Sequence, residues 1–314
     1  MRIDPFLVLL LSFAGMGIVL PAQGTASEVV GVLVQIGIAM LFFLYGARLS
    51  TAEVRNGATA WRAHLLIVSI TFGLFPLLGL SLHLFSPAAI SPALLAALLF
   101  LCTVPSTVQS SVAFTGIAGG DGAVAVVAAS LSSLLGVFLT PLLVAALIGS
   151  HAAITATAIG RIVLLLLLPF ALGQLSRRWL AGWVNDHRST LLRFDRSTVL
   201  LVVYAGFSKG TNAGVWSQLR WLDAAVVIVS VAALLAISSA YCLLASKRFD
   251  RGTQIAIYFC GTNKSLAAGL PIASVLFSAS TFPLMILPLM LYHQLQLIVG
   301  SFVASRWANK VRAD

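Results

Sequence analysis

Charged side chains are scarce in this chain of 314 residues. Asp, Glu, Lys and Arg make up 9% of it, whereas 60% is apolar; a soluble globular domain carries roughly 25% charged residues. No charged residue lies between Arg62 and Asp121, or between Asp121 and Arg161. Because a membrane-spanning helix needs only about 20 apolar residues, these runs exclude a soluble enzyme and predict a polytopic membrane protein.

Acidic residues and cysteines are too few, and too far apart, for several common kinds of site. The only glutamates, Glu28 and Glu53, lie at the edges of apolar runs, and every aspartate is at an edge or in a loop, so carboxylate catalysis within the membrane has no candidates. Cys102, Cys242 and Cys260 form no CxxC pair, which argues against a disulfide framework and a zinc site. No HExxH motif is present either. We therefore expect a protein that is not an enzyme, with no catalytic residues and no cofactor.

The apolar runs, separated by Pro, Gly and charged residues, predict an all-α membrane protein of ten transmembrane helices. The predicted spans cover residues 6–21, 29–49, 64–85, 91–118, 122–149, 157–177, 197–217, 223–246, 254–279 and 281–305.

Basic residues are distributed unevenly between the loops on the two sides of these spans. With both termini in the cytoplasm, only Arg161, Lys209 and Arg220 fall outside. The basic residues on the cytoplasmic side are Arg2, Arg48, Arg55, Arg62, Arg177, Arg178, Arg188, Arg193, Arg196, Lys247, Arg248, Arg251, Arg306, Lys310 and Arg312. The positive-inside rule therefore predicts a multi-pass plasma-membrane protein, in the inner membrane if the cell is Gram-negative. The net charge of +10 indicates this orientation and not a nucleic-acid partner.

Ten spans divide into two halves of five, residues 1–155 and 156–314. An odd number of spans in each half inverts the second copy, as in many secondary transporters. The second span ends in LFFLYG at 41–46, and the seventh has LVVYAG at 201–206. The fourth span of each half is also the most polar one. We therefore predict two inverted repeats that form one integral membrane unit.

The polar stretch of the fourth span follows Pro105, which removes a backbone donor and should break the helix. Irregular backbone at membrane depth is tolerated where it lines a cavity or meets a ligand. The side-chain oxygens beside this break favour an alkali-ion or polar-substrate site; they belong to Thr107, Gln109, Ser110 and Ser111. The structural alternative for any one of these side chains is a bond to its own backbone or helix packing.

Lys264 is the only charged residue of the predicted span 254–279 and lies about ten residues from its start, far from either end. A charge at this depth costs several kcal/mol, so such residues usually have a function. The ammonium could bind an anionic substrate, stand in for a bound cation, or lose its proton during transport. The structural alternative is an ammonium held by carbonyls of the facing broken helix. The polar neighbours that complete this predicted site are Thr262, Asn263 and Ser265.

Further polar residues lie in the fifth and tenth spans. His293, Gln294 and Gln296 interrupt the otherwise apolar tenth span, and Ser130 lies in the fifth. We expect these four residues to form a second layer around the site, with helix packing as the alternative. Ser132 and Ser133 are interpreted as helix-packing residues. Gly206, Gly210 and Gly214, spaced by four, are interpreted as a packing face.

The chain resembles the bile acid–sodium symporter family, most of all a bacterial branch of candidate symporters that includes a vertebrate orphan member. The resemblance covers essentially the whole chain and is carried by 41–50, 105–114, 259–266 and 293–296. It implies ten helices in two inverted repeats, a panel domain and a core domain, and fourth and ninth helices that unwind and cross. It places sodium and substrate ligands near Gln109, Ser110 and Ser111 on one helix and near Thr262, Asn263 and Lys264 on the other.

The chain departs from the sodium-coupled members of that family at one position of the site. Those members carry a ninth-helix glutamate that ligates sodium, whereas this span has no acidic residue and contains Lys264. A protonated lysine would repel sodium with little water to screen the two charges. We therefore hypothesise that the ammonium replaces the coupling cation; bound sodium is kept as an open alternative.

The sequence favours a secondary transporter for a small organic anion. The alternatives are an uncoupled or proton-linked facilitator or exporter, and a non-transporting membrane regulator with the same fold. The lipid bilayer is the other partner that we expect. The substrate, the direction of transport and the oligomeric state do not follow from the sequence.

Overall fold

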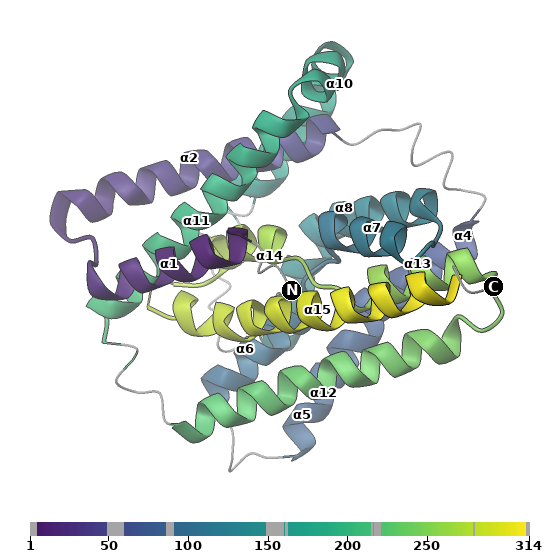
Figure 1. The fold of residues 1–314 in the computed structure, drawn as a ribbon. Helices are drawn as coiled ribbons and strands as arrows, with labels where there is room; N and C mark the ends of the chain where they lie inside the picture. The colour runs from purple at the N-terminus through teal and green to yellow at the C-terminus, as the bar shows by residue number, and fades with distance from the viewer. Residues whose placement is uncertain are drawn as a thin grey trace. The chain divides into compact units, whose positions relative to one another are not determined.

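The computed structural model describes residues 5–48, 60–85, 91–148, 160, 163–214, 216, 221–278 and 280–311. Helices are the regular structure of this part of the chain (Figure 1). Their bounds are α1 Pro5–Val19, α2 Gly24–Arg48, α4 Trp61–Ser69, η2 Ile70–Leu74, α5 Phe75–Phe85, α6 Pro92–Thr103, α7 Val108–Ile117, α8 Gly122–Ile148, η3 Val163–Leu167, α10 Leu168–Asp186, α11 Arg188–Asn212, α12 Trp221–Ala245, α13 Arg251–Thr262, α14 Leu266–Leu276 and α15 Phe282–Val311. The segments η2 and η3 are π-helical turns.

The chain forms two compact units, and each unit takes segments from both halves of the sequence. Unit 1 comprises residues 1–49, 149–220 and 270–286, and unit 2 comprises 50–148, 221–269 and 287–314. The division passes through α14 and α15. It is a grouping by packing, so it leaves the predicted repeats 1–155 and 156–314 as a prediction.

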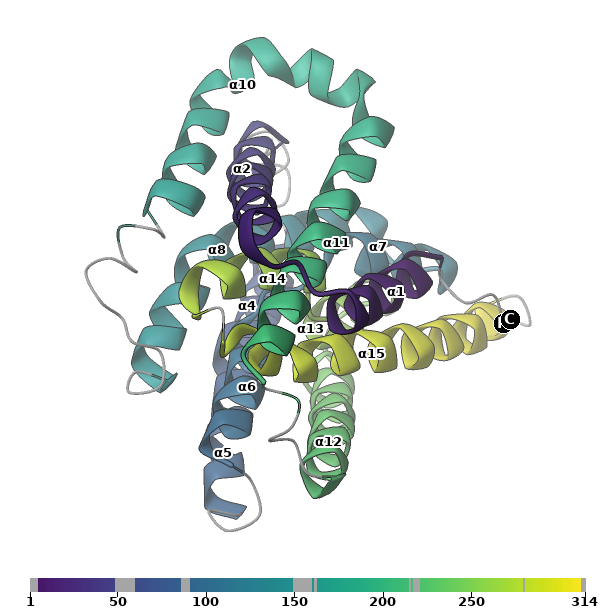
Figure 2. The same ribbon diagram turned by 90° about the vertical axis from the view of Figure 1, so that its left-hand side faces the viewer.

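In unit 1, helix α2 lies between α10 and α11 (Figure 2). Two glycines allow the close approach of α2 and α10. A Cβ at Gly46 would collide with the carbonyl oxygen of Phe170, and one at Gly173 would collide with that of Phe43. The motif 41–46 therefore ends in a glycine because the backbone of α10 occupies the space of a side chain.

The cytoplasmic end of α2, as the sequence predicts it, also carries a partly buried ion pair. Arg48 Nη1 lies 2.6 Å from Asp195 Oδ2, and a second bond joins Nη2 to Oδ1 at 3.4 Å. Leu44, Val184 and Leu191 pack together next to this pair. The pair thus ties α2 to α11 where the apolar cluster ends.

The glycine face of α11 packs as the sequence predicts at two of its three positions. A Cβ at Gly206 would overlap the ring of Phe282, and one at Gly210 would lie 2.5 Å from Pro283 Cγ. Gly214 has a φ of +67° in the turn after α11, a conformation that glycine adopts readily.

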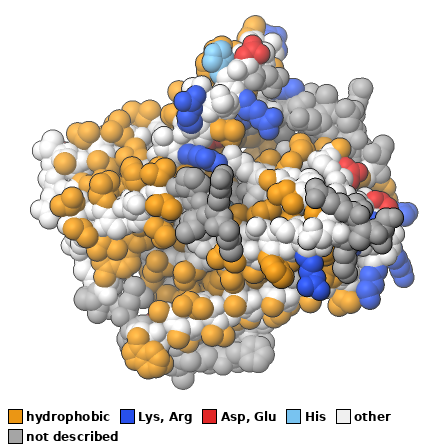
Figure 3. Space-filling view, in the orientation of Figure 1, with side chains coloured by type: hydrophobic (Ala, Val, Ile, Leu, Met, Phe, Trp, Pro, Cys, Tyr) orange, Lys and Arg blue, Asp and Glu red, His pale blue; other side chains and the backbone are white. Residues whose placement is uncertain are grey.

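Six described helices are long and apolar enough to cross a membrane: Gly24–Arg48, Trp61–Leu82, Gly122–Ile148, Val163–Val184, Trp221–Ala245 and Phe282–Asn309. The bent pair of α6 and α7 makes a seventh if it is one span. Large apolar side chains are exposed along these helices, and Figure 3 shows hydrophobic atoms over much of the face in view. A polytopic, all-helical membrane protein is therefore confirmed.

The remaining three of the ten predicted spans stay predictions. Residues 6–21 contain a shorter apolar helix, Val8–Val19, 197–217 fall within α11, and 254–279 fall on α13 and α14. Several residues of the charge count lie outside the described part of the chain, as does the repeat boundary at 155–156; these residues are Arg2, Arg55, Arg161, Arg220 and Arg312.

Candidate functional site: two helix breaks in contact

The first break lies in unit 2 between α6 and α7, whose axes are bent by 59°. Val104 is extended, with φ −74° and ψ 143°, and Thr107 is extended too. A residue before proline is disfavoured in helical conformation, and Pro105 has no N–H to continue the ladder. The helix therefore ends at Thr103 and starts again at Val108.

Side chains of α8 satisfy the backbone groups that this break leaves open. Thr140 Oγ1 donates to Thr103 O at 2.8 Å. Ser132 Oγ accepts from the Ser106 N–H at 3.0 Å, and Ser133 Oγ donates to Ser106 O at 3.4 Å. Since an unpaired buried backbone group costs about 1–3 kcal/mol, α8 stabilises the broken conformation.

The second break lies between α13, which ends at Thr262, and α14, which begins at Leu266. Asn263 is extended, with φ −78° and ψ 144°. Ser265 Oγ accepts from the Ala268 N–H at 3.1 Å and caps α14. Tyr292 of α15 donates its hydroxyl to Thr262 O at 2.6 Å. The last carbonyl of α13 thus has a side-chain partner in place of the next helical turn.

Gln296 of α15 binds the peptide groups of Lys264. Its Oε1 accepts from Lys264 N at 2.6 Å, and its Nε2 donates to Lys264 O at 2.9 Å. A backbone N–H can only donate, so this bond fixes which end of the amide is oxygen. The second Nε2 proton then points to His293 Nδ1, 2.9 Å away. His293 Nδ1 is therefore an acceptor here.

The two breaks meet directly. Ser265 N donates to Pro105 O at 2.8 Å. The Nζ of Lys264 lies 2.8 Å from Val104 O, 3.3 Å from Cys102 O and 3.0 Å from Thr71 O. Three ammonium protons thus face three backbone carbonyls, two of them at the C-terminal end of α6, which carries the negative end of the helix dipole.

The surroundings of the Lys264 ammonium complete its enclosure. Nζ lies 3.9 Å from the centroid of the Phe75 ring, a cation–π contact. The residue has 0% of its surface exposed. Thr71 belongs to the π-helical turn η2, a kind of irregularity that is frequent at functional sites. Burial and these three contacts hold Nζ in a cage of carbonyls, out of reach of a dissolved anion.

The predicted polar residues beside the breaks fall into buried and open groups. Asn263 Nδ2 donates to Ser111 Oγ at 3.0 Å and approaches Ser110 Oγ at 3.4 Å. Ser111 in turn donates to Phe259 O at 3.1 Å. Thr107 and Asn263 are buried, Ser110 is half-buried and Gln109 is exposed. Asn263 is therefore in contact with Ser110 and Ser111 of the other helix, whereas Thr262 Oγ1 donates to Tyr258 O of its own helix at 2.7 Å.

Some polar groups near the two breaks lack hydrogen-bond partners, and two of the predicted residues take no part in the contacts between the breaks. The hydroxyls of Thr71 and Ser106 are buried without a hydrogen bond in the described structure. Ser130 and Gln294 are half-buried, and neither makes a side-chain hydrogen bond to another described residue. No group of three His, Cys, Asp or Glu side chains in the described ranges lies close enough to hold a metal ion.

Sequence reasoning did not assign the residues that close the breaks from outside. No sequence pattern marks Thr140 or Tyr292, and the contacts of Ser132 and Ser133 with Ser106 go beyond the helix packing that the sequence predicts. The sequence does show polar residues in the helix that follows each break. It does not show which backbone carbonyl or N–H each of these residues binds.

Long apolar helices, with two interruptions joined by hydrogen bonds from a buried lysine, are features of a membrane transporter. Comparison with known proteins agrees with that class. Residues 4–309 match the family described as SBF-like CPA transporters, and the chain belongs to this family.

Bacterial and vertebrate relatives extend the match. An uncharacterized protein of Pseudomonas aeruginosa is 43% identical over 98% of this chain and 93% of its own length. YfeH of Escherichia coli K12, by name a candidate symporter, is 41% identical over 98% of this chain and 94% of its own. Sodium/bile acid cotransporter 7 of the rat is 28% identical, covering 85% of this chain and 80% of its own length. The family and these names make the protein a membrane transporter and not an enzyme.

Proposed function

We propose that the protein is a secondary active transporter that moves an organic anion across the membrane by alternating access at the crossing of the two breaks. In this proposal the Lys264 ammonium takes the place of a coupling sodium ion. The observation that carries it is the cage of three carbonyl oxygens around Nζ, at 2.8–3.3 Å. Carbonyls of unwound backbone and half-helix C-termini are the groups that bind sodium in transporters with discontinuous helices.

A tethered cation has a defined consequence for the ion coupling of transport. The positive charge stays in the site through the cycle, whereas a sodium ion enters and leaves with the substrate. Transport would then be uncoupled from sodium; it is secondary active where protons drive it, and the alternative is a facilitator driven by the anion's own gradient. Substrate would meet the open side of the crossing, near Gln109 and Ser110, because the ammonium itself is fully enclosed.

The proposed architecture is ten spans in two inverted repeats, with a panel and a core domain and both termini in the cytoplasm. In each half, side chains of one helix hydrogen-bond to the backbone groups at the break; we call each such set of bonds a clamp. The two clamps support the proposed repeat. In the first half, the fifth predicted span supplies Ser132 and Thr140 to the break in the fourth. In the second half, the fifth predicted span supplies Tyr292 and Gln296 to the break in the fourth. Equivalent helices thus have the same role in each half.

Uptake of organic carboxylates and sulfonates into proteoliposomes tests the function. We expect uptake that is the same with an inward sodium gradient and with choline in its place. Sodium-driven uptake by the wild type that persists in Lys264→Ala would contradict the replacement of sodium. Uptake driven only by an inward proton gradient would support the proton-linked form.

A non-transporting regulator with the same fold is the second candidate. It is distinguished by water access: cysteines introduced at Gln109 and Ser110 should react with a membrane-impermeant thiol reagent in a transporter. A cysteine in place of Leu98, which is fully buried, is the matched control and should stay unreactive. No labelling at either site, together with no uptake, would favour the regulator.

A further inference from the structure

We propose that the end of α10 and the start of α11, residues 175–196 in unit 1, form a binding surface for the headgroups of anionic phospholipids. We call this segment the basic hairpin. Nothing in the transport proposal requires it, and the observations that carry it lie outside the crossing.

The outer face of α10 identifies the neighbouring phase as lipid. Leu168, Leu172 and Leu175 are 44%, 48% and 71% exposed, and Trp179 and Trp183 follow at 67% and 50%. Steps of three and four residues place all five on one face of a helix. The helix belongs to a segment apolar enough to span a membrane. The leucine part of this face therefore contacts acyl chains.

The change from leucine to tryptophan locates the membrane surface along α10. Tryptophan concentrates at the level of the headgroups, because its ring is apolar and its N–H is polar. The guanidinium of Arg178 lies over the ring of Trp179, with Cζ 3.8 Å from its centroid. A cation is thus held at the depth at which lipid phosphates lie.

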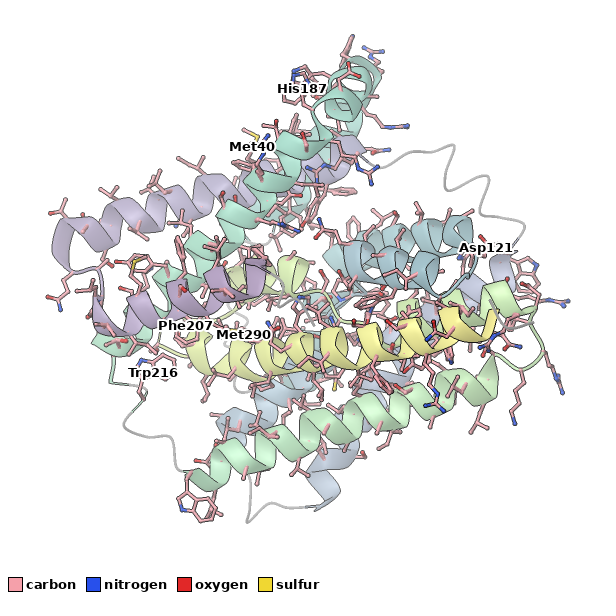
Figure 4. All side chains as sticks on the ribbon, in the orientation of Figure 1. Met40, Asp121, His187, Phe207, Trp216 and Met290 are labelled. Carbon is pink, nitrogen blue, oxygen red and sulfur yellow. The ribbon has the colours of Figure 1, made fainter. Side chains whose placement is uncertain are left out.

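Helix α11 adds further cations to the hairpin. Arg188, Arg193 and Arg196 are all exposed. His187 lies at the turn between the two helices, as Figure 4 shows. Arg178 and Arg196 are each nine residues from His187 along their own helices, which is roughly 13 Å at 1.5 Å per residue. The arginines therefore cover the hairpin from its tip to the level of Trp179.

The acidic residues of the hairpin do little to cancel this charge. Asp195 is buried and paired with Arg48, which leaves Asp186 as the exposed carboxylate among the described hairpin residues. Four exposed arginines against one exposed aspartate give this surface a net charge of +3 (4 − 1). Basic clusters next to a spanning helix attract anionic lipids, with an effect that falls off within a Debye length.

The test is lipid binding to the purified full-length protein, followed by native mass spectrometry in detergent. The probes are dioleoyl phosphatidylglycerol and dioleoyl phosphatidylcholine. We expect the wild type to bind phosphatidylglycerol at least tenfold more tightly than phosphatidylcholine. The triple variant R188Q/R193Q/R196Q should lose most of this preference. The variant K247Q/R248Q, which removes exposed charges between α12 and α13, is the matched control and should keep it.

Two further arms keep the proposal falsifiable if the triple variant does not fold. R193Q alone should reduce the preference about threefold, and raising salt on the wild type should weaken binding of phosphatidylglycerol only. Inorganic phosphate at millimolar concentration should not displace the lipid. Equal binding of the two lipids, an unchanged preference in R188Q/R193Q/R196Q, or full displacement by phosphate would overturn the proposal.

Discussion

The side chain of Gln296 is hydrogen-bonded to both backbone polar groups of Lys264, through Oε1 to N at 2.6 Å and through Nε2 to O at 2.9 Å. The amide side chain thereby satisfies the backbone N–H and C=O of Lys264, as a neighbouring strand would in a sheet. Gln296 is 1% exposed, so water does not compete for these two hydrogen bonds. The extended backbone that directs Lys264 into its cage depends on this pairing.

Gln296→Leu should therefore destabilise the second break. The substitution leaves a buried N–H and a buried C=O unpaired, at about 1–3 kcal/mol each. We expect a loss of about 3 kcal/mol in thermal denaturation of the purified protein, and a large fall in uptake. Gln294→Leu, two positions away and half-buried, should change stability by less than about 0.5 kcal/mol. Equal losses for both variants would show that the pairing with Lys264 is not the cause.

Lys264→Ala should create a sodium-dependent protein. Removing the ammonium leaves the carbonyls of Thr71, Cys102 and Val104 facing an empty space, and we expect a loss of at least about 3 kcal/mol. Sodium fits a carbonyl cage, so NaCl should raise the Tm of this variant above its value in choline chloride at equal ionic strength.

The wild type and Lys247→Ala, which alters an exposed lysine, are the controls for that measurement. Neither should distinguish sodium from choline, because the ammonium fills the cage in both. A wild-type Tm that rises with sodium as much as that of Lys264→Ala would mean that sodium binds elsewhere, and that Lys264 is not its substitute.

Ser132→Ala tests the clamp on the first break. Ser132 Oγ accepts from the Ser106 N–H and is fully buried, so its loss leaves a donor unpaired. We expect about 1–2 kcal/mol of destabilisation. Ser130→Ala, on the same helix but with no hydrogen bond to another described residue, should be close to neutral. The reverse order of the two variants would contradict the assignment.

The end of α6 at Thr103 has a local cause that can be read from the sequence. Pro105 lacks a donor and constrains Val104, and no property of distant residues is needed to expect a helix end there. Lys264 stands out because a lone charge in an apolar span is costly wherever the helix packs. Apolar run length likewise predicts the six or seven spans.

The partners of these local features depend on tertiary packing, and the sequence does not supply it. Tyr292 meets Thr262 across 30 positions, and Thr140 meets Thr103 across 37. The hydroxyl of a tyrosine or threonine in an apolar helix could bind many different carbonyls, depending on how the helices pack. Whether Lys264 contacts a substrate or replaces a cation depends in the same way on the position of Nζ in the fold. That position is set by the backbone carbonyls of α6 and η2, which lie far from Lys264 in the sequence.

Gly46→Ala should disrupt unit 1 although it adds only a methyl group. The new Cβ would collide with the carbonyl oxygen of Phe170, and backbone cannot move aside as a side chain can. We expect a loss of about 1–3 kcal/mol. Gly182→Ala is the matched control on α10, because nothing lies within 4 Å of its Cβ position. That variant should be neutral or stabilising, since alanine favours a helix. Similar Tm values for the two variants would contradict the close approach.

Acid should weaken the start of α13 through Asp250, which lies in the loop before that helix. Its carboxylate accepts hydrogen bonds from the side chain and the backbone N–H of Thr253, the latter at 3.0 Å, and these bonds lower the pKa of Asp250. Because the pKa of Asp250 is lower in the folded protein, its stabilising effect is fully present when the pH is above the pKa of the unfolded chain, about 3.9. This effect is lost as the pH falls through the pKa of Asp250 in the folded protein.

Asp250→Ala should cost about 1 kcal/mol at pH 7, the usual contribution of an N-cap, and the difference in stability from wild type should shrink toward pH 3. Asp250→Asn keeps a cap that does not titrate, so its stability relative to Asp250→Ala should not change with pH. Thermal denaturation of the three proteins at pH 7, 5 and 3 measures this, and a wild-type advantage that is constant over that range would rule out titration of Asp250 as its source.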